Sequence, residues 1–391
     1  MKSLSSREPN IIVSKTGTLR TISELWRLVG FGGEGMLRMN TNAEQETGGI
    51  PLAVTIRGAE TENVHHGHIA VVDAAGKLIA WAGDPAVPTF MRSTAKPVQA
   101  LPILSAGVMD IYELPEDAIA MMTASHRGEP VHLQMLELML HETGIKEEEL
   151  VFDRGLPLDI EARDIYIRSG GKPRKLFHNC AGKHIGLLAA CKLEEWPSAT
   201  YAELDHPIQQ SIRHWIAELT DLSASELTGG FDGCGLPVYA IPLRKLALLY
   251  ARLASPPTNL NEDVQQMLDR ITCAMNARPD LVEGTGRLAS VLLRDRNCVA
   301  KSGAQGVFAL GLRQERLGII VKMSDGSELA WPVILPAVLQ QLADNGLLPT
   351  SEADRLSQQI GEAFPSSMYN DSGRMIGRRE AGVQLHFTKT S

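Results

Sequence analysis

Apolar positions change their spacing twice along this chain. From residue 51 to residue 83 they form short runs, two of which flank an Asp-Ala-Ala-Gly turn at residues 73–76, as the strands of a β-hairpin would. For roughly 200 residues after Ser93 they recur at helical spacing, and strand-like runs return only near residue 298. We expect helices at 130–143, 207–219, 242–254 and 261–276, strands at 298–303, 307–313 and 317–323, helices near 328–345 and 352–364, and a last strand near 374–386.

This order of elements predicts a mixed α/β or α+β protein with an antiparallel sheet flanked by helices. The sheet would be assembled from both ends of the chain. We expect a discontinuous sheet domain made of residues 50–92 and 285–391, and a mainly α-helical domain, residues 93–284, inserted into it. Concave binding sites commonly form between two domains, so the site is expected there.

Residues 1–49 differ from the rest of the chain. They are rich in Ser, Thr, Asn and Gly, with one patch of helical period at residues 19–31, and they never assemble the continuous apolar stretch of a secretory signal. We interpret them as a flexible or artefactual extension. The alternative is that translation starts at Met36 or Met39, and in either case residues 1–35 are expected to be dispensable.

Composition restricts the partners of the protein more than it identifies them. The 391 residues are 44% hydrophobic with a formal net charge of −8 and no block of like charges, which favours neither nucleic acid nor an anionic membrane as a partner. No apolar run approaches the roughly 20 residues of a membrane span. The five cysteines lack the pattern of a disulfide framework, which favours a reducing cytoplasm. Those expected only to pack are Cys191, Cys273 and Cys298.

Ser93 and Lys96 carry the clearest candidate chemistry. The S-x-x-K spacing sets a hydroxyl and an amine one helical turn apart on the same face. A serine attacks poorly at neutral pH unless a base takes its proton, and a lysine that burial has deprived of its own proton can be that base. Taken alone the motif recurs by chance, so a capping serine beside a solvated lysine is the alternative.

Further candidate residues stand downstream in turn-like and glycine-rich motifs. Ser125 lies in SHRGEP and Lys301 in AKSGAQG, while Cys180 and Lys183 lie in HNCAGKH and Cys234 in FDGCGLP. Thiolates suit zinc, but C-x-x-K followed by a distant cysteine is not a zinc-finger spacing, and a lysine can ligate a metal only as the neutral amine. On residue types alone, these cysteines could equally be buried packing residues.

In their order and gaps, the motifs RSTAKPVQA, SHRGEP, HNCAGKH, GGFDGCGLP, ARPDLVEGTGR and AKSGAQG resemble the zinc-containing bacterial L-asparaginase II family (Rhizobium-type asparaginase). That family is related to serine β-lactamases and serine-dependent glutaminases. The resemblance runs from about Pro51 to about Gly382. It implies a β-lactamase-like fold and two Ser–Lys pairs, without deciding which serine is acylated. The implied pairs are Ser93 with Lys96 and Ser125 with Lys301.

The resemblance also implies a metal and a way to hold the substrate. By this resemblance, zinc would be bound by Cys180, Lys183 and Cys234, with room left for water or substrate. The resemblance also implies a homodimer, because the family tends to form one. Substrate-binding candidates that could also be purely structural are Arg92, Asp232 and His184.

We therefore expect an L-asparagine amidohydrolase that releases aspartate and ammonia through a serine activated by lysine. A primary amide is a poor acyl donor, so an oxyanion hole is required, and the amides near Ser93 and Gly303 are the candidates. A glutaminase or another amidase on the same scaffold is the first alternative. A β-lactamase is disfavoured by the absence of an S-D-N motif, and a zinc-binding relative without turnover is the non-enzyme alternative.

Overall fold

The structure, a computed structural model, describes residues 48–389. The described residues all belong to one compact unit. The expectations about the N-terminal extension, including a start at Met36 or Met39 and the dispensability of residues 1–35, lie outside the described residues. The proposed boundaries between a sheet domain and a helical domain stay a prediction.

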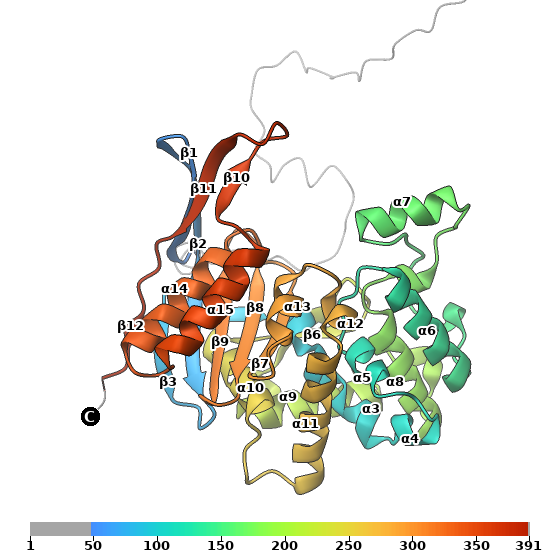
Figure 1. Cartoon of the computed structure of the whole chain (residues 1–391). Helices are drawn as coiled ribbons and strands as arrows, with labels where there is room; N and C mark the ends of the chain where they lie inside the picture. The colour runs from blue at the N-terminus through green and yellow to red at the C-terminus, as the bar shows by residue number, and fades with distance from the viewer. Residues whose placement is uncertain (1–47, 390–391) are drawn as a thin grey trace, which may run out of the picture. The chain divides into compact units, whose positions relative to one another are not determined.

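The main sheet is antiparallel and takes its strands from both ends of the chain, as the sequence predicts (Figure 1). Its strand order is β10-β11-β1-β2-β9-β8-β7, with β3 pairing both β2 and β12. The early strand β1 thus lies between β2 and the late strand β11, which fastens the C-terminal segment to the start of the domain. The strands are β1 Ile50–Arg57, β2 Glu60–Asp73, β3 Leu78–Ala82, β7 Cys298–Gly303, β8 Val307–Leu312, β9 Leu317–Met323, β10 Ser367–Tyr369, β11 Met375–Ala381 and β12 His386–Phe387.

Strands β7 and β8 are buried at every position, because helices cover the centre of the sheet. Such strands read as continuous apolar runs instead of alternating ones. Helix α10 packs against β2, β8 and β9, although the sequence assigned its residues to the helical domain. In Figure 1 helices α14 and α15 lie over the sheet. The expected helices at both places are confirmed, with α10 spanning Leu243–Ala254, α14 Trp331–Asp344 and α15 Thr350–Ala363.

The block between β4 and β7 is mainly helical. The predicted helices α6, α9 and α11 are confirmed within one or two residues, and α6 and α9 each begin with a proline, whose missing N–H has no partner at that position anyway. The helical elements are η1 Arg92–Ala95, α2 Lys96–Gln99, α3 Leu101–Ser105, α4 Val108–Ile111, α5 Asp117–Met122, α6 Pro130–Thr143, η2 Glu147–Glu149, α7 Ile160–Arg168, η3 Lys175–Phe177, α8 Ala181–Leu193, η4 Ser198–Thr200, α9 Pro207–Thr220, η5 Ala224–Glu226, α11 Glu262–Ala277, α12 Pro279–Glu283 and α13 Leu288–Leu293.

A second, three-stranded sheet within this block was not expected from the sequence. It has the order β4-β6-β5, with β4 at Pro88–Phe90, β5 at Thr228–Phe231 and β6 at Pro237–Pro242. Strand β5 reads Thr-Gly-Gly-Phe, which has neither the length nor the alternation that marks a strand in sequence. This small sheet fixes the turn that carries Cys234.

Two smaller expectations need correction. The last predicted strand near 374–386 is two strands, because β11 pairs with β1 and β10 while β12 pairs with β3. Cys273 was expected to pack in the interior but is exposed, whereas Cys191 and Cys298 are buried as expected. The helical period around Cys273 places it on the solvent side of α11. Among residues 48–389 no helix is both long and apolar enough to cross a membrane.

Candidate active site

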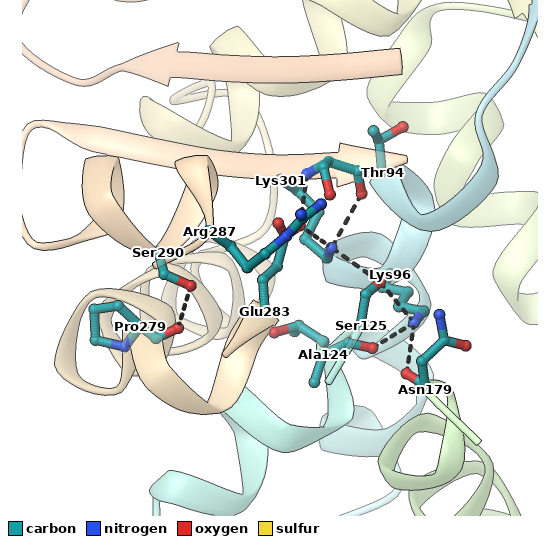
Figure 2. Close-up of polar contacts among 12 residues, drawn as sticks. Thr94, Lys96, Ala124, Ser125, Asn179, Pro279, Glu283, Arg287, Ser290 and Lys301 are labelled. Carbon is teal, nitrogen blue, oxygen red and sulfur yellow. Dashed lines mark hydrogen bonds and ion pairs between the residues drawn. The ribbon is translucent and has the colours of Figure 1, made fainter. Parts of the chain in front are cut away.

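Ser125 stands where two buried lysines meet (Figure 2). The Oγ atom of Ser125 lies 3.0 Å from Nζ of Lys96 and 3.0 Å from Nζ of Lys301. Lys96 opens α2, Lys301 lies on β7, and Ser125 follows α5, where its backbone N–H donates to the carbonyl oxygen of Val282 at 2.7 Å. Three segments that are far apart in sequence therefore build one cluster.

The surroundings of Lys96 make its charged form less favourable than it would be in water. Its side chain is 1% exposed, and besides Ser125 its amine contacts only the carbonyl oxygens of Ala124 and, at 3.2 Å, Asn179. Burial is the main cause that lowers the pKa of Lys96 from 10.5 to about 8, with the cations Lys183 and Lys301 acting in the same direction. This difference corresponds to about 3 kcal/mol against the charged form.

Lys301 has a different partner, the buried carboxylate of Glu283. The Oε1 atom of Glu283 accepts a hydrogen bond from Lys301 and two more from Ser302, from its backbone N–H and its hydroxyl, each at 2.7 Å. Burial lowers the pKa of Lys301, but the negative charge of Glu283 opposes that shift. Burial alone would raise the pKa of Glu283, and the contacts with Lys301 and Ser302 reverse it, so that the carboxyl stays ionised.

Ser93 lies in the turn η1 and is partly exposed, and its hydroxyl makes no hydrogen bond within residues 48–389. The sequence paired Ser93 with Lys96, whereas the structure turns the amine of Lys96 toward Ser125. The preceding residue, Arg92, has φ of 48°, a left-handed conformation that costs a non-glycine residue about 1–2 kcal/mol. Its guanidinium is held by Asp232, with Nε 3.0 Å and a terminal nitrogen 2.8 Å from Oδ1.

Close packing between β7 and η1 brings the two halves of the site together. A Cβ atom on Gly303 would lie 3.2 Å from the Thr94 side chain and 3.3 Å from the carbonyl oxygen of Met91, so a larger residue would push the strand away. The hydroxyl of Tyr250 also donates to the carbonyl oxygen of Thr94 at 2.8 Å. The amide of Ser302 already donates to Glu283, which leaves the expected oxyanion hole near Gly303 without that donor.

The second group of expected residues also comes together. Cys180 caps α8, Lys183 lies one turn further along that helix, and Nζ of Lys183 lies 3.4 Å from Sγ of Cys234. Helix α8 approaches α5 so closely that a Cβ on Gly182 would lie 2.2 Å from the carbonyl oxygen of Met121. This contact fixes the start of α8 next to the loop of Ser125.

The two thiols shift each other's pKa in opposite directions. The hydrogen bond from Cys234 is the main cause that lowers the pKa of Cys180, and nearby Lys96 and Lys183 add to it against the effect of burial. The same hydrogen bond, together with burial, raises the pKa of Cys234. Burial alone would lower the pKa of Lys183, but the two sulfurs raise it above its ordinary value. These directions favour a thiolate at Cys180 and an ammonium at Lys183.

The donor atoms fit a zinc ion in kind and in spacing. Zn–N of about 2.0 Å and Zn–S of about 2.3 Å at a tetrahedral angle give an N···S separation of about 3.5 Å, close to the 3.4 Å between Lys183 and Cys234. Within the described part of the chain, no three His, Cys, Asp or Glu side chains gather as a metal site, so Lys183 would have to be the third ligand. It could serve only after losing its proton.

His184, a substrate-binding candidate from the sequence, lies fully buried. Its Nδ1 is 2.7 Å from the hydroxyl of Tyr201, and its ring lies edge-on to Phe152. Its expected role stays a prediction. A pocket of about 650 Å³ opens beside this region, and its lining includes Asn179, Cys234, Asp153 and Arg154.

Glu283 is a member of the Ser–Lys cluster that the sequence analysis did not single out. It lies in ARPDLVEGTGR, which was recognised as a motif without a role for any of its members. A carboxylate before a glycine normally reads as a turn residue. Asn179 was missed as well, because it contacts Lys96 through its backbone oxygen, and a backbone contact leaves no mark on the residue type.

A partly exposed serine flanked by two buried amines is an arrangement suited to a hydrolase that works through an acylated serine. The chain matches the family model described as L-asparaginase II over residues 53–380 and therefore belongs to the L-asparaginase II family. This family places it among hydrolases that act on amides, with a small-molecule substrate. No curated protein sequence matches the chain significantly.

Solved structures with a similar fold share little sequence with this chain. A β-lactamase from Mycobacterium bovis is 14% identical, with 70% of this chain and 94% of that chain covered and a TM-score of 0.41. A structure of a protein named Mglu is 16% identical, with 73% of this chain and 68% of that chain covered and a TM-score of 0.32. Mglu in its glutamate form is also 16% identical, with coverage of 73% and 61% and a TM-score of 0.31.

Proposed function

We propose that the protein hydrolyses the side-chain amide of L-asparagine to aspartate and ammonia through an acyl-enzyme on Ser125. Membership in the L-asparaginase II family supports the reaction class. The observation that carries the proposal is the position of Ser125, whose hydroxyl lies 3.0 Å from each of two buried amines.

The partners of Lys96 decide the direction of the first proton transfer. Carbonyl oxygens can only accept hydrogen bonds, so a neutral Lys96 donates its two N–H groups to Ala124 and Asn179. Its lone pair then faces Ser125 and accepts the O–H hydrogen. When Ser125 Oγ attacks the amide carbon, the proton moves to Lys96. Lys96 next passes it to the departing nitrogen, which leaves as ammonia, and a water molecule repeats the sequence to release aspartate.

Lys301 acts from the other side of Ser125. Because it is paired with Glu283, it keeps its proton more readily than Lys96 and donates a hydrogen bond to Oγ as negative charge develops there. Glu283 holds the amine in place and is in turn held by Ser302. One lysine is therefore the base and the other the electrostatic support.

Substrate would approach through the pocket beside Asn179 and Cys234. Arg92 and Asp232, the residue before Gly233 of the pocket lining, form an ion pair, and a guanidinium and a carboxylate suit the two charged groups of an amino acid. Zinc on Cys180, Lys183 and Cys234 would, when bound, act as a Lewis acid toward an oxygen of substrate or water. Its ligands would have to include Lys183 as the neutral amine.

The decisive experiment is to trap and map the acyl-enzyme. Purified protein is mixed with L-asparagine, quenched within one turnover and digested, and the acylated peptide is identified by mass. Acylation within residues 123–130 supports Ser125. Acylation within residues 92–96 would instead make Ser93 the nucleophile, and Ser125 would then relay the proton of Ser93 to Lys96. The partial exposure of Ser93 and its unbonded hydroxyl would allow this role.

Ammonia release separates the substrates. Turnover of L-asparagine well above that of L-glutamine is expected, and the reverse order would favour the glutaminase reading. The metal content of the same protein is measured. If neither L-asparagine nor L-glutamine releases ammonia, the protein would be a zinc-binding relative without turnover. Homodimerisation and a cytoplasmic location, both implied by the resemblance or by cysteine usage, remain proposals that size-exclusion chromatography and cell fractionation can test.

A further inference from the structure

A cavity of about 360 Å³ lies behind the Lys301–Glu283 pair, and none of the chemistry above uses it. It is bordered by Glu283 and Ser302 on the side of the Ser–Lys cluster and by the apolar side chains of Trp331 and Phe364 elsewhere. Strand β11 contributes Arg379. Its volume is at the small end of the range for ligand pockets, which limits an occupant to a short molecule.

One cationic side chain in the wall of this cavity has no anionic partner among the described residues. Glu283 is matched by Lys301, and Arg287 is matched by Glu328, whose carboxylate lies 2.5 Å from the guanidinium. Arg379 forms no ion pair with any residue in the range 48–389, and its Nε is buried without a hydrogen-bond partner. The indole N–H of Trp331, a side chain that is 2% exposed, is also buried without a partner.

Buried donors without partners are costly, and nearly all of them in folded proteins find one. The donors of a guanidinium match the two oxygens of a carboxylate. The neighbouring Arg378 shows the contrast, because strand residues alternate between faces and Arg378 points away from the cavity to an exposed pair with Glu380. Arg379 is thus the cation that the strand directs to this site.

We propose that this cavity binds a small carboxylic acid of the size of the amino-acid product, with its carboxylate on Arg379 and its carbon chain against Trp331 and Phe364. The class of ligand is a short mono- or dicarboxylate. Binding there does not depend on the proposed function. The cavity is separate from the pocket beside Asn179 and Cys234, with which it shares no lining residue.

The position of the cavity gives its occupant a way to act on the Ser–Lys cluster, and this consequence does rest on the proposed function. Glu283 and Ser302 border the cavity and hold Lys301, which contacts Ser125. A second carboxylate beside Glu283 would weaken the hold of Ser302 on Glu283 and so loosen the position of Lys301 beside Ser125. The acid product would then inhibit without competing for the substrate pocket.

Tryptophan fluorescence tests binding without any use of activity, because Trp331 lines the cavity. Full-length protein is titrated with succinate and, separately, with L-aspartate. We expect a saturable fluorescence change that disappears in Trp331→Phe. In Arg379→Gln the apparent Kd should rise about tenfold or more, the loss expected for a charge-assisted hydrogen bond, while Arg378→Gln is the matched control and should stay within about twofold of wild type.

Three results would overturn the site: no saturable change in wild type, a change that persists in Trp331→Phe, or equal affinities in Arg379→Gln and Arg378→Gln. If Arg379→Gln does not fold by circular dichroism, Arg379→Lys replaces it. That variant keeps the charge but loses the planar fork, and it should bind several-fold more weakly than wild type, whereas equal binding would contradict the proposal. Ammonia-release kinetics with added succinate then test the coupling separately, so a protein without amidase activity would still leave the binding result intact.

Discussion

Lys96 and Lys183 are both buried, lie on neighbouring elements and differ in the direction of their pKa shifts. Burial lowers the pKa of Lys96 to about 8, because its partners are a hydroxyl and carbonyl oxygens without net charge. Burial also acts to lower the pKa of Lys183, but the adjacent sulfurs of Cys234 and Cys180 outweigh it and raise the value. The same residue type is therefore a base in one region and a cation in the other.

The comparison shows that buried lysines differ through the charge of their partners, because burial acts to lower the pKa of each of them. Lys301 is the intermediate case, since its pKa is lowered by burial but a carboxylate limits the shift. Lys96 and Lys301 can thus serve Ser125 in different ways while holding it at equal distances. The sulfur atoms beside Lys183 stabilise its protonated form. Lys183 can therefore bind a metal only when the metal ion takes the place of a proton on its amine.

The largest expected effect comes from removing the base or its serine. Lys96→Ala and Ser125→Ala should each lower kcat for L-asparagine by about 10²–10⁴-fold, because proton transfer in the first step is lost. Lys301→Ala is expected to lose activity by orders of magnitude as well. The double variant Lys96→Ala/Ser125→Ala should be no worse than the poorer single one.

Lys192→Ala, at a partly exposed lysine that contacts a backbone oxygen, is the matched control and should keep wild-type turnover. Near-wild-type activity in either Lys96→Ala or Ser125→Ala would remove these residues from the mechanism. Losses that simply add in the double variant would assign the two residues to separate steps.

The thiol region should lose its metal when its sulfurs are changed. Protein purified without chelators is expected to contain about one zinc per chain, and Cys180→Ser/Cys234→Ser should contain almost none, as measured by elemental analysis. Cys191→Ser, at a buried thiol outside the cluster, is the control. Because two thiols and an ammonium must all lose protons, bound zinc should fall steeply as the pH is lowered.

Undiminished zinc in the double variant would rule out this assignment. Zinc that persists to low pH would point to carboxylate ligands instead, for which the described residues offer no cluster of three.

A smaller effect on activity should follow from removing the negative charge of Glu283, which is paired with Lys301 and not with Lys96. Glu283→Gln keeps the shape of the side chain but not its negative charge, so the pKa of Lys301 should fall and its support of Ser125 should weaken. We expect kcat to drop about 10–100-fold, on the scale of one lost oxyanion donor, and its pH dependence to change. Glu328→Gln, which alters a carboxylate paired with Arg287 and not with Lys301, is the control, and equal losses in both variants would argue against a special role for Glu283.

Much of the fold could be predicted because its helices and central strands carry a clear period. Helices α6, α9, α10 and α11 were located within about two residues. The β4-β6-β5 sheet could not be predicted, since β5 is four residues long and half glycine. Its pairing depends on β4, which stands far away in sequence.

The composition of the site was predictable, and so was the contact of Ser125 with Lys301, but the partner of Lys96 was not. The motifs identified Ser93, Lys96, Ser125 and Lys301, yet S-x-x-K spacing assigned Lys96 to Ser93. The actual partner, Ser125, is brought in by the loop after α5, whose backbone is tied to Val282. Glu283 escaped notice because its role depends on burial and on contact with β7.

The smallest expected effect is a shift in the pH at which activity appears, and it links the two regions. Lys96 must be neutral to accept the proton of Ser125, so kcat/KM should rise with pH and level off above about 8, the pKa of Lys96. Burial has the largest effect on the pKa of Lys96, and the thiolate of Cys180 has the second largest. The thiolate raises this pKa. In zinc-free protein, Cys180→Ser should therefore move the midpoint to lower pH by a fraction of a unit, whatever its effect on the maximal rate, while zinc-free Cys191→Ser should not move it. A midpoint that stays in place would mean that solvent screens the two regions from each other, and a shift to higher pH would contradict the assignment of Cys180 as the thiolate.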